Sequence, residues 1–384
     1  MTLNSKKKLV IYSGAPISYE NSIKSYGFHK LSKKKFSISF VEGAEIFHKK
    51  KVVEEFRKIS KKSDRFKADV RLRNILEFKN FFKRLNKKSI VIVINRGPLN
   101  PPSLRKNFDI AYFNFLKLKY ISFNFLHWSI KCNFKKSLFL NSCKLFWNFL
   151  IHILIRIQNK ENKPFLKVGS GNMFVKNMKN KKNIINCSSS YINFDKKKHQ
   201  KRNIIYVDEG VIQSRDKILY NFLPKKIGNH KIFLKDLNQL FNFLENKFKL
   251  RVIIAASNKY EYKKNPFSGR KIVYGKTNEL INNAKFIVGH SSSALYQSLL
   301  TKSPVLILKH KEFGLKRKIL IDLFASNIFN QNSIFIEEII SKKKLRIYND
   351  KMFRYKILRE YFISDKLDYK NFIFYFEKGL KQFT

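Results

Sequence analysis

Two adjacent carboxylates follow an apolar run in the second half of the sequence. Asp208 and Glu209 come directly after "NIIYV" and precede Gly210. Because a carboxylate at the end of a buried strand is held in a defined place, either acid could serve as the general base that deprotonates a hydroxyl group. The structural alternative is a turn fixed by Gly210, since Asp-Glu-Gly occurs by chance in many loops. We predict a catalytic role for Asp208 or Glu209.

Three consecutive serines separate an apolar run from a helix-like run in "KFIVGHSSSALYQSLL". Backbone N–H groups without partners and the positive end of a helix dipole meet at such a junction, which favours an anion. The alternatives are that one serine is only an N-cap, and that the histidine is a polar residue satisfied at a strand end. The sequence predicts a phosphate or sugar-nucleotide site that comprises His290, Ser291, Ser292 and Ser293.

A third polar cluster follows the apolar run "RVIIAA". Carboxyl ends of parallel strands lie side by side at one rim of a sheet, so this cluster is expected near the other two. Its polar side chains are candidates for binding a nucleotide or its phosphate. The residues assigned to it are Ser257, Asn258, Lys259, Lys276 and Thr277, beside Gly210 of the acidic motif.

Strand-like and helix-like runs alternate along the whole chain. Residues 9–13, 36–41 and 90–94 read as strands and 70–85 as a helix, and the alternation restarts after residue 203 with a helix at 233–248. This pattern predicts an α/β fold with two Rossmann-like domains that face each other across a cleft.

Polar stretches at 176–182 and 195–202 mark the expected domain boundary. We predict an N-terminal, acceptor-binding domain at 1–195 and a C-terminal, nucleotide-sugar-binding domain at 196–384. The final aromatic-rich helix, expected at 369–380, is predicted to pack back onto the N-terminal domain.

The chain carries a formal charge of +53, from 80 Lys and Arg against 27 Asp and Glu. Such a charge favours contact with phosphate groups or an anionic membrane surface. The lysines are scattered instead of grouped with aromatic residues on one face, so no specific nucleic-acid partner is expected. A solvated lysine-rich surface is the alternative.

The cysteines and the apolar segments indicate in which cellular compartment the protein is expected. Three widely spaced cysteines, Cys132, Cys143 and Cys187, predict neither a disulfide framework nor a metal site, which fits a reducing compartment. The apolar run near the N-terminus is too short for a signal peptide and reads as the first strand. Residues 138–157 contain charged side chains, so they fit a core helix or an interfacial helix better than a membrane span.

The acidic motif "DEG" and the serine motif "SSS", each after a strand in the C-terminal half, resemble motifs of bacterial sialyltransferases and related GT-B glycosyltransferases. The phrase from "NPFSGRKIVYGKTNELI" to "GHSSSAL" is also similar to bacterial surface-carbohydrate biosynthesis proteins, and the resemblance covers residues 203–310. It implies an acid that activates the acceptor hydroxyl and serines that bind the nucleotide phosphate. The sequence departs from the family at Ser257 and Asn258, where a His-Pro pair is expected, and serine cannot replace a cationic general acid.

The resemblance implies a glycosyltransferase of surface polysaccharide or lipopolysaccharide biosynthesis that acts in the cytoplasm, peripherally at the inner membrane. Its partners would be a nucleotide-sugar donor, CMP-linked by preference and carrying a sialic-acid-like sugar, and a glycan or lipid-linked acceptor. No cofactor and no metal are implied. Two alternatives stay open: a sugar-nucleotide epimerase with carboxylates on both domains, for which Glu42 and Glu45 are the N-terminal candidates, and an inactive basic protein that binds nucleic acid or membranes.

Overall fold

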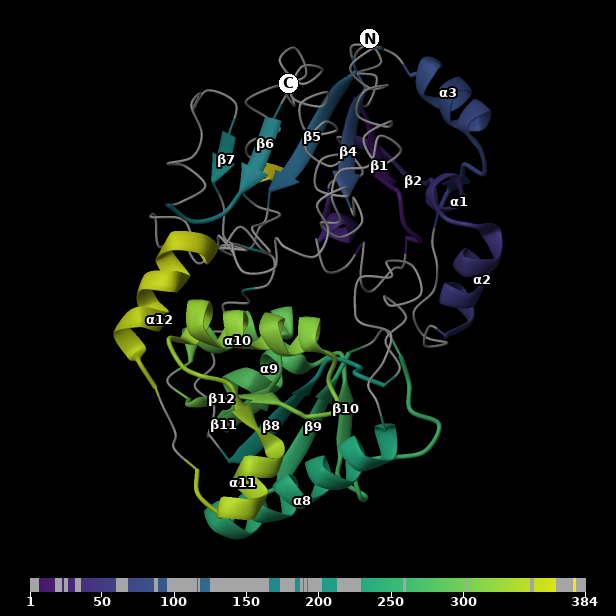
Figure 1. Ribbon diagram of the computed structural model, residues 1–384. Helices are drawn as coiled ribbons and strands as arrows, with labels where there is room; N and C mark the ends of the chain where they lie inside the picture. Colours follow the sequence, from purple (N-terminus) through teal and green to yellow (C-terminus); the bar gives the residue numbers. More distant parts are fainter. Residues whose placement is uncertain are drawn as a thin grey trace, which may run out of the picture.

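The protein contains two parallel β-sheets, one in each half of the chain (Figure 1). The computed structural model describes residues 7–17, 23, 27–31, 36–59, 68–85, 89–94, 116, 118–124, 166–172, 184–186, 189, 192, 202–212, 229–257, 260–301, 303–345, 349–363 and 376–377. Every statement below concerns these residues.

The first sheet has seven strands in the order β3-β2-β1-β4-β5-β6-β7, and all neighbouring pairs run parallel. Its central strands are continuous apolar runs because both faces of a parallel sheet are covered. Its helices are α1 (Ala44–Phe47), α2 (Lys50–Ile59) and α3 (Ile75–Lys83). The strands are β1 (Lys7–Ser13), β2 (Phe36–Glu42), β3 (Val70–Arg71), β4 (Ile90–Ile94), β5 (Lys119–Asn124), β6 (Leu166–Gly169) and β7 (Ile184–Asn186).

The second sheet has six strands in the order β10-β9-β8-β11-β12-β13, again parallel throughout. Its strands are β8 (Asn203–Asp208), β9 (Val252–Ala256), β10 (Ile272–Tyr274), β11 (Ala284–Gly289), β12 (Val305–Lys309) and β13 (Ile334–Phe335). The two sheets confirm the predicted α/β fold class with two Rossmann-like domains, the architecture of GT-B proteins. The cleft expected between them stays a prediction.

Helices cover both faces of the second sheet. Figure 1 shows α8 (His230–Phe248) and α11 (Ile336–Lys342) on one side, and α9 (Thr277–Asn282) and α10 (Leu315–Phe329) on the other. The buried face of α8 repeats at helical spacing through Phe233, Leu237 and Leu244, which are at most 1% exposed. A short 3₁₀ segment, η6 (Ser293–Leu300), connects β11 to β12.

The C-terminal segment contacts the first domain. Beyond α12 (Lys351–Ile357) the chain continues through a π-helical turn at Leu358–Phe362. There the Tyr361 carbonyl accepts a hydrogen bond of 2.7 Å from the Ser170 hydroxyl. Phe376 is fully buried in the core of the first domain, with its ring 6.2 Å from that of Phe28. The boundary predicted at 195/196 falls between β7 and β8 and stays a prediction.

One predicted helix is corrected by the structure. Residues 70–85 do not form a single helix, because β3 adds Val70 and Arg71 to the edge of the first sheet before α3 begins at Ile75. The prediction missed the edge strands β3 and β13, whose two residues each are too few to show a periodicity.

Several predictions lie outside the described residues. These are the segment at 138–157, the three cysteines and, except for residues 376–377, the helix at 369–380. Among the residues that are described, no helix is long and apolar enough to cross a membrane.

Candidate functional site

The three polar clusters follow neighbouring strands of the second sheet. β9, β8 and β11 are adjacent, with Asp208 in register with Ala256 and Gly289 in register with Val207. This order places the acidic motif in the middle, between Ser257 on one side and the serine motif on the other. The predicted meeting of strand ends at one rim is therefore present in the structure.

Asp208 is a buried carboxylate whose two oxygens both accept hydrogen bonds from protein donors. The hydroxyls of Tyr260 and Tyr262 donate to Oδ2 at 2.8 and 2.7 Å, and the Gly210 N–H donates to Oδ1 at 3.0 Å. Burial raises the pKa of Asp208, although these three hydrogen bonds act to lower it. Asp208 is thus held in place and shielded from a substrate hydroxyl.

Gly210 makes this arrangement sterically possible. Its φ is +65°, and a Cβ atom there would lie 2.4 Å from Cε1 of Tyr260. A side chain at this position would both strain the backbone and displace the tyrosine that holds Asp208.

Glu209 connects the acidic motif to the serine motif. Its Oε1 accepts a hydrogen bond of 2.6 Å from Nη2 of Arg317, and its carboxylate is also bonded by the backbone of Ser291. Burial alone would raise the pKa of Glu209, but the Arg317 guanidinium and the two hydrogen bonds outweigh it, and the pKa is lowered. The side chain is 16% exposed, so unlike Asp208 it retains contact with solvent.

Arg317 is a site residue that the sequence reading missed. It lies in the first turn of α10, is 3% exposed, and stacks its guanidinium 4.5 Å from the centre of the Phe313 ring. Its Nε atom is buried without a hydrogen-bond partner among the described residues. A cation in the first turn of a helix opposes the helix dipole, but Lys316 and Lys318 share that turn, so the sequence alone does not single out Arg317.

His290 points into the core. Its Nδ1 lies 2.8 Å from the Leu308 carbonyl, which can only accept, so Nδ1 carries the proton and Nε2 accepts from the Tyr206 hydroxyl at 2.9 Å. Burial lowers the pKa of His290 to about 4, which keeps the ring neutral at pH 7. Both ring nitrogens are occupied, so the ring offers a phosphate no donor, and only the backbone of His290 stays a candidate ligand.

The serines begin η6. The Ser292 hydroxyl accepts a hydrogen bond of 3.3 Å from the Ala294 N–H, so Ser292 performs the capping role of the structural alternative. Ser291 is half-buried and Ser293 is exposed. A phosphate role for the three serines stays a proposal.

The remaining predicted residues are more scattered. Ser257 is half-buried directly after β9, whereas Asn258 and Lys259 lie outside the described residues. Thr277 opens α9 and Lys276 precedes it as an exposed residue. The Gly275 N–H bonds the Ala256 carbonyl at 3.2 Å, which brings this segment next to the end of β9.

One trio of side chains in the second domain has ligand types that suit a metal: Asp236, His310 and Glu337. Nε2 of His310 lies 3.0 Å from Asp236 and 3.2 Å from Glu337. The Glu312 N–H donates to Nδ1 of the same ring, so Nε2 carries the proton and faces the carboxylates as a donor. In this tautomer the trio is a hydrogen-bonded clamp between β12, α8 and α11, with no nitrogen lone pair for a metal.

Comparisons with known proteins give only distant likenesses. No family model and no curated protein matches the chain. Among solved structures, the UDP-GlcNAc 2-epimerase of Neisseria meningitidis bound to UDP-GlcNAc is 9% identical, with a TM-score of 0.46 over 98% of this chain and 100% of that one. MurG of Acinetobacter baumannii is 7% identical, with a TM-score of 0.45 over 98% and 99% of the two chains.

A third solved structure is the H444N variant of the wall teichoic acid polymerase TagF. It is 11% identical, with a TM-score of 0.46 over 98% of this chain and 90% of that one. Likenesses at this level do not assign an activity to the chain.

Proposed function

We propose that the protein is a nucleotide-sugar-dependent glycosyltransferase. The second domain would bind the nucleotide donor at the rim where β8, β9 and β11 end, and the first domain would bind the acceptor. The observation that carries the proposal is the contact of Glu209 with both Arg317 and Ser291, because it joins the acidic and serine motifs at the rim where parallel sheets bind ligands.

Glu209 is the better candidate for the general base. The oxygens of Asp208 already accept three protein hydrogen bonds, whereas Glu209 is ionised, partly exposed and next to the serine motif. In the proposed reaction Glu209 takes the proton of the acceptor hydroxyl. The acceptor oxygen then forms a bond to the anomeric carbon of the donor, and the nucleotide leaves with the electrons of the broken bond. Asp208 positions the strand end.

The nucleotide phosphates are proposed to lie at the start of η6, beside Ser291, Ser292 and Ser293. Backbone N–H groups at a helix start and small hydroxylated side chains favour phosphate. Ser257, Lys276 and Thr277 follow or flank the adjacent strands and complete the proposed donor site.

The finer assignment rests on the motif resemblance. It favours a CMP-linked, sialic-acid-like sugar as the donor and a surface glycan or lipid-linked molecule as the acceptor. The sugar would be transferred on the cytoplasmic side of the inner membrane. The charge of +53 supports attraction to anionic lipid there.

A thermal-shift screen tests the donor. A ligand that binds only the folded protein raises the melting temperature by mass action, so CMP and CMP-sialic acid should raise it, and the Ser292→Asp variant should lose the shift. A shift with UDP and UDP-sugars instead would reject the CMP preference. Failure of every nucleotide and sugar nucleotide to shift the melting temperature would reject the proposed donor site.

One observation favours the epimerase alternative. An epimerase would need a carboxylate from the first domain on the opposite side of the sugar from the second domain, and Glu42 ends a strand of the first domain. However, Glu42 is 2% exposed, accepts a hydrogen bond of 2.8 Å from the Ile17 N–H and pairs with Arg57. Incubation of a UDP-sugar with the protein and no acceptor separates the two activities, since NMR would detect a second epimer only in the epimerase case.

A further inference from the structure

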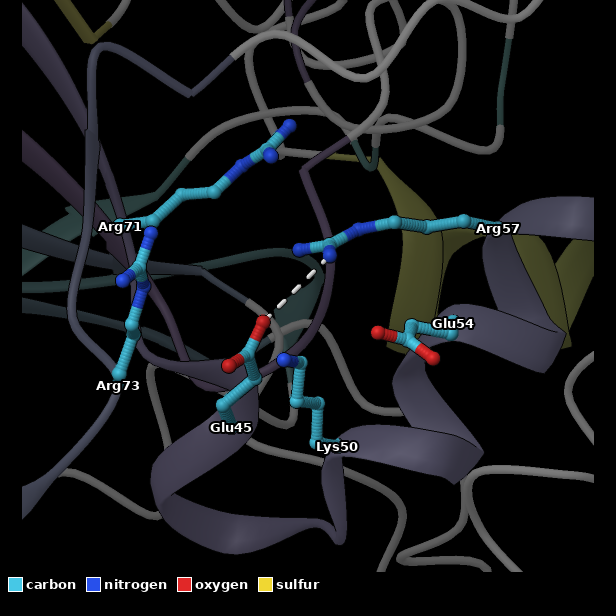
Figure 2. A pocket seen from close by; sticks show the side chains of 6 residues that line it. All are labelled: Glu45, Lys50, Glu54, Arg57, Arg71 and Arg73. Atoms are coloured by element: carbon cyan, nitrogen blue, oxygen red, sulfur yellow. Dashed lines mark ion pairs between the residues drawn. The ribbon is translucent and has the colours of Figure 1, made fainter.

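A charged pocket of about 510 Å³ lies in the first domain, where β2 and β3 end (Figure 2). The pocket is separate from the proposed donor site, which belongs to the other sheet. The lining side chains come from α1 and α2, which follow β2, and from the end of β3 and the residues just after it. The lining residues are Glu45, Lys50, Glu54, Arg57, Arg71 and Arg73.

One lining residue of the pocket, Arg57, is held by a mostly buried ion pair. Glu42, the last residue of β2, pairs with Nη2 of Arg57, and Nη1 of the same guanidinium lies 3.5 Å from Glu45. Arg57 is 18% exposed in its side chain, so α2 is attached to the strand end through a mostly buried group. The two carboxylates hold Arg57 in one orientation and leave one side of it facing the pocket.

The opposite wall carries two arginines without such partners. Arg71 ends β3 and Arg73 follows two positions later, and both side chains line the pocket. Both are exposed, and no carboxylate among the described residues lies within ion-pair distance of either. Figure 2 shows the Arg57 and Arg71 side chains extending toward the middle of the pocket from opposite sides.

The charges of the pocket do not balance. Four lining residues are cationic and two are anionic, and Glu45 already faces Arg57. Guanidinium groups that converge repel one another unless an anion lies between them. The planar fork of arginine matches the two oxygens of a carboxylate or phosphate, and it does so better than the point charge of lysine.

We propose that this pocket binds a carboxylate or phosphate group of a saccharide, with Arg71 and Arg73 as its main ligands and Arg57 as a fixed third cation. That the anionic group belongs to a saccharide, and that this saccharide is the acceptor of the transfer, both rest on the proposed glycosyltransferase function. The binding of the anionic group does not. The substrate class is therefore an acidic or phosphorylated sugar instead of a neutral one.

Calorimetric titration of the full chain with three probes tests the proposal. Glucose 6-phosphate and glucuronate present the two anionic groups, and glucose presents neither. One or both anionic sugars should bind, glucose should not, and Arg71→Ala/Arg73→Ala should weaken the binding by about tenfold or more, since each hydrogen bond to a charged group contributes at least that factor. If only one of the two binds, it identifies the group, and if both bind, the tighter one identifies the preferred group.

A matched control separates the pocket from the general basicity of the chain. Lys83→Ala/Arg84→Ala removes the same number of charges from exposed positions at the end of α3 and should leave the binding within about twofold of the unmodified chain. Equal losses in both double variants, or no loss in Arg71→Ala/Arg73→Ala, would overturn the proposal. Arg71→Lys/Arg73→Lys keeps the charge and folds on the same backbone, so it should bind more weakly than the unmodified chain and better than the alanine pair.

The same variants show whether the pocket assignment or the glycosyltransferase proposal is wrong. The nucleotide-induced thermal shift should be unchanged in Arg71→Ala/Arg73→Ala, because the donor site lies on the other domain. If nucleotides never shift the chain but anionic sugars bind through Arg71 and Arg73, the pocket stands and the glycosyltransferase proposal falls. If nucleotides shift it and no anionic sugar binds, the pocket assignment falls alone.

Discussion

The two acids at the end of β8 differ in what surrounds them, and this difference predicts different phenotypes. Glu209→Gln should lower turnover by about 10² to 10⁴ and leave nucleotide binding nearly intact, because it removes the base without changing its shape. Asp208→Asn should mainly lower stability, since its amide group would present donors to the Tyr260 and Tyr262 hydroxyls. Steady-state kinetics and denaturant unfolding of both variants check this. Equal turnover in Glu209→Gln and the unmodified chain would contradict the assignment.

His290 makes the stability of the fold depend on pH. The unfolded histidine has a pKa near 6.5 and the folded one a pKa of about 4, chiefly because of burial. Between these values the unfolded chain binds a proton that the folded chain does not. The contribution of His290 to the free energy of unfolding is therefore fully present above pH 6.5, and it falls by roughly 3 kcal/mol as the pH drops to about 4.

A variant without the titrating ring isolates this effect. His290→Gln should be less stable than the unmodified chain at pH 7, and the gap in unfolding free energy should narrow as the pH falls toward 4.5. Asp208, whose pKa is raised, has the opposite pH dependence, but it is present in both proteins and cancels in the difference. Parallel stability curves for the two proteins would show that His290 is not buried neutral.

At the scale of elements, the start of η6 tests whether the serines are more than a cap. Ser292→Ala loses the acceptor for the Ala294 N–H and should cost about 1 kcal/mol of stability, with a modest loss of nucleotide binding. Ser292→Asp keeps a capping oxygen and so should keep stability. Its carboxylate, close to Glu209 and at the positive end of the helix, should nearly abolish nucleotide binding. Calorimetry that shows Ser292→Asp binding like the unmodified chain would leave capping as the whole role.

The sequence predicts the parallel strands and the meeting of their ends at one rim, whereas the predicted start of one helix is wrong. Alternating apolar runs and helix-length segments are enough to imply parallel strands with their ends at one rim, and β8, β9 and β11 meet as expected. In the region 70–85 the helix start was also encoded. The Asn74 side chain accepts from the Glu77 N–H at 2.9 Å as an N-cap, and the Glu77 carboxylate accepts from the N–H of the preceding residue, Arg73, at 2.8 Å.

The surroundings of the two acids could not be read from the sequence. Tyr260 and Tyr262 reach Asp208 from the loop after β9, and Arg317 reaches Glu209 from α10. The first two contacts depend on the path of a loop whose residues show no periodicity, and the third depends on where α10 packs against the second sheet. The sequence could therefore propose Asp208 and Glu209 as equal candidates, and only the three-dimensional arrangement of their partners separates them.

At the scale of the whole molecule, residues 360–362 near the C-terminus contact the first domain. The Ser189 N–H donates to the Phe362 carbonyl at 2.8 Å, close to the contact between Ser170 and Tyr361. A Cβ atom on Gly171 would lie 2.3 Å from the Glu360 carbonyl oxygen, so the two backbones meet without room for a side chain. Such contacts attach the segment at 360–362 to the first domain, although no strand of its sheet comes from that segment.

Phe376 provides the test of this connection. Its side chain is fully buried against Phe28 in a cluster with the strands of the first sheet, so Phe376→Ala should cost about 3 to 5 kcal/mol of the free energy of unfolding. Tyr355→Ala on α12 is the matched control, because that side chain is 47% exposed and its removal should change stability by at most about 0.5 kcal/mol. Denaturant unfolding measures both variants. If Phe376→Ala is as stable as the control, the C-terminal segment does not anchor on the first domain, and the proposed domain division loses the segment that packs back.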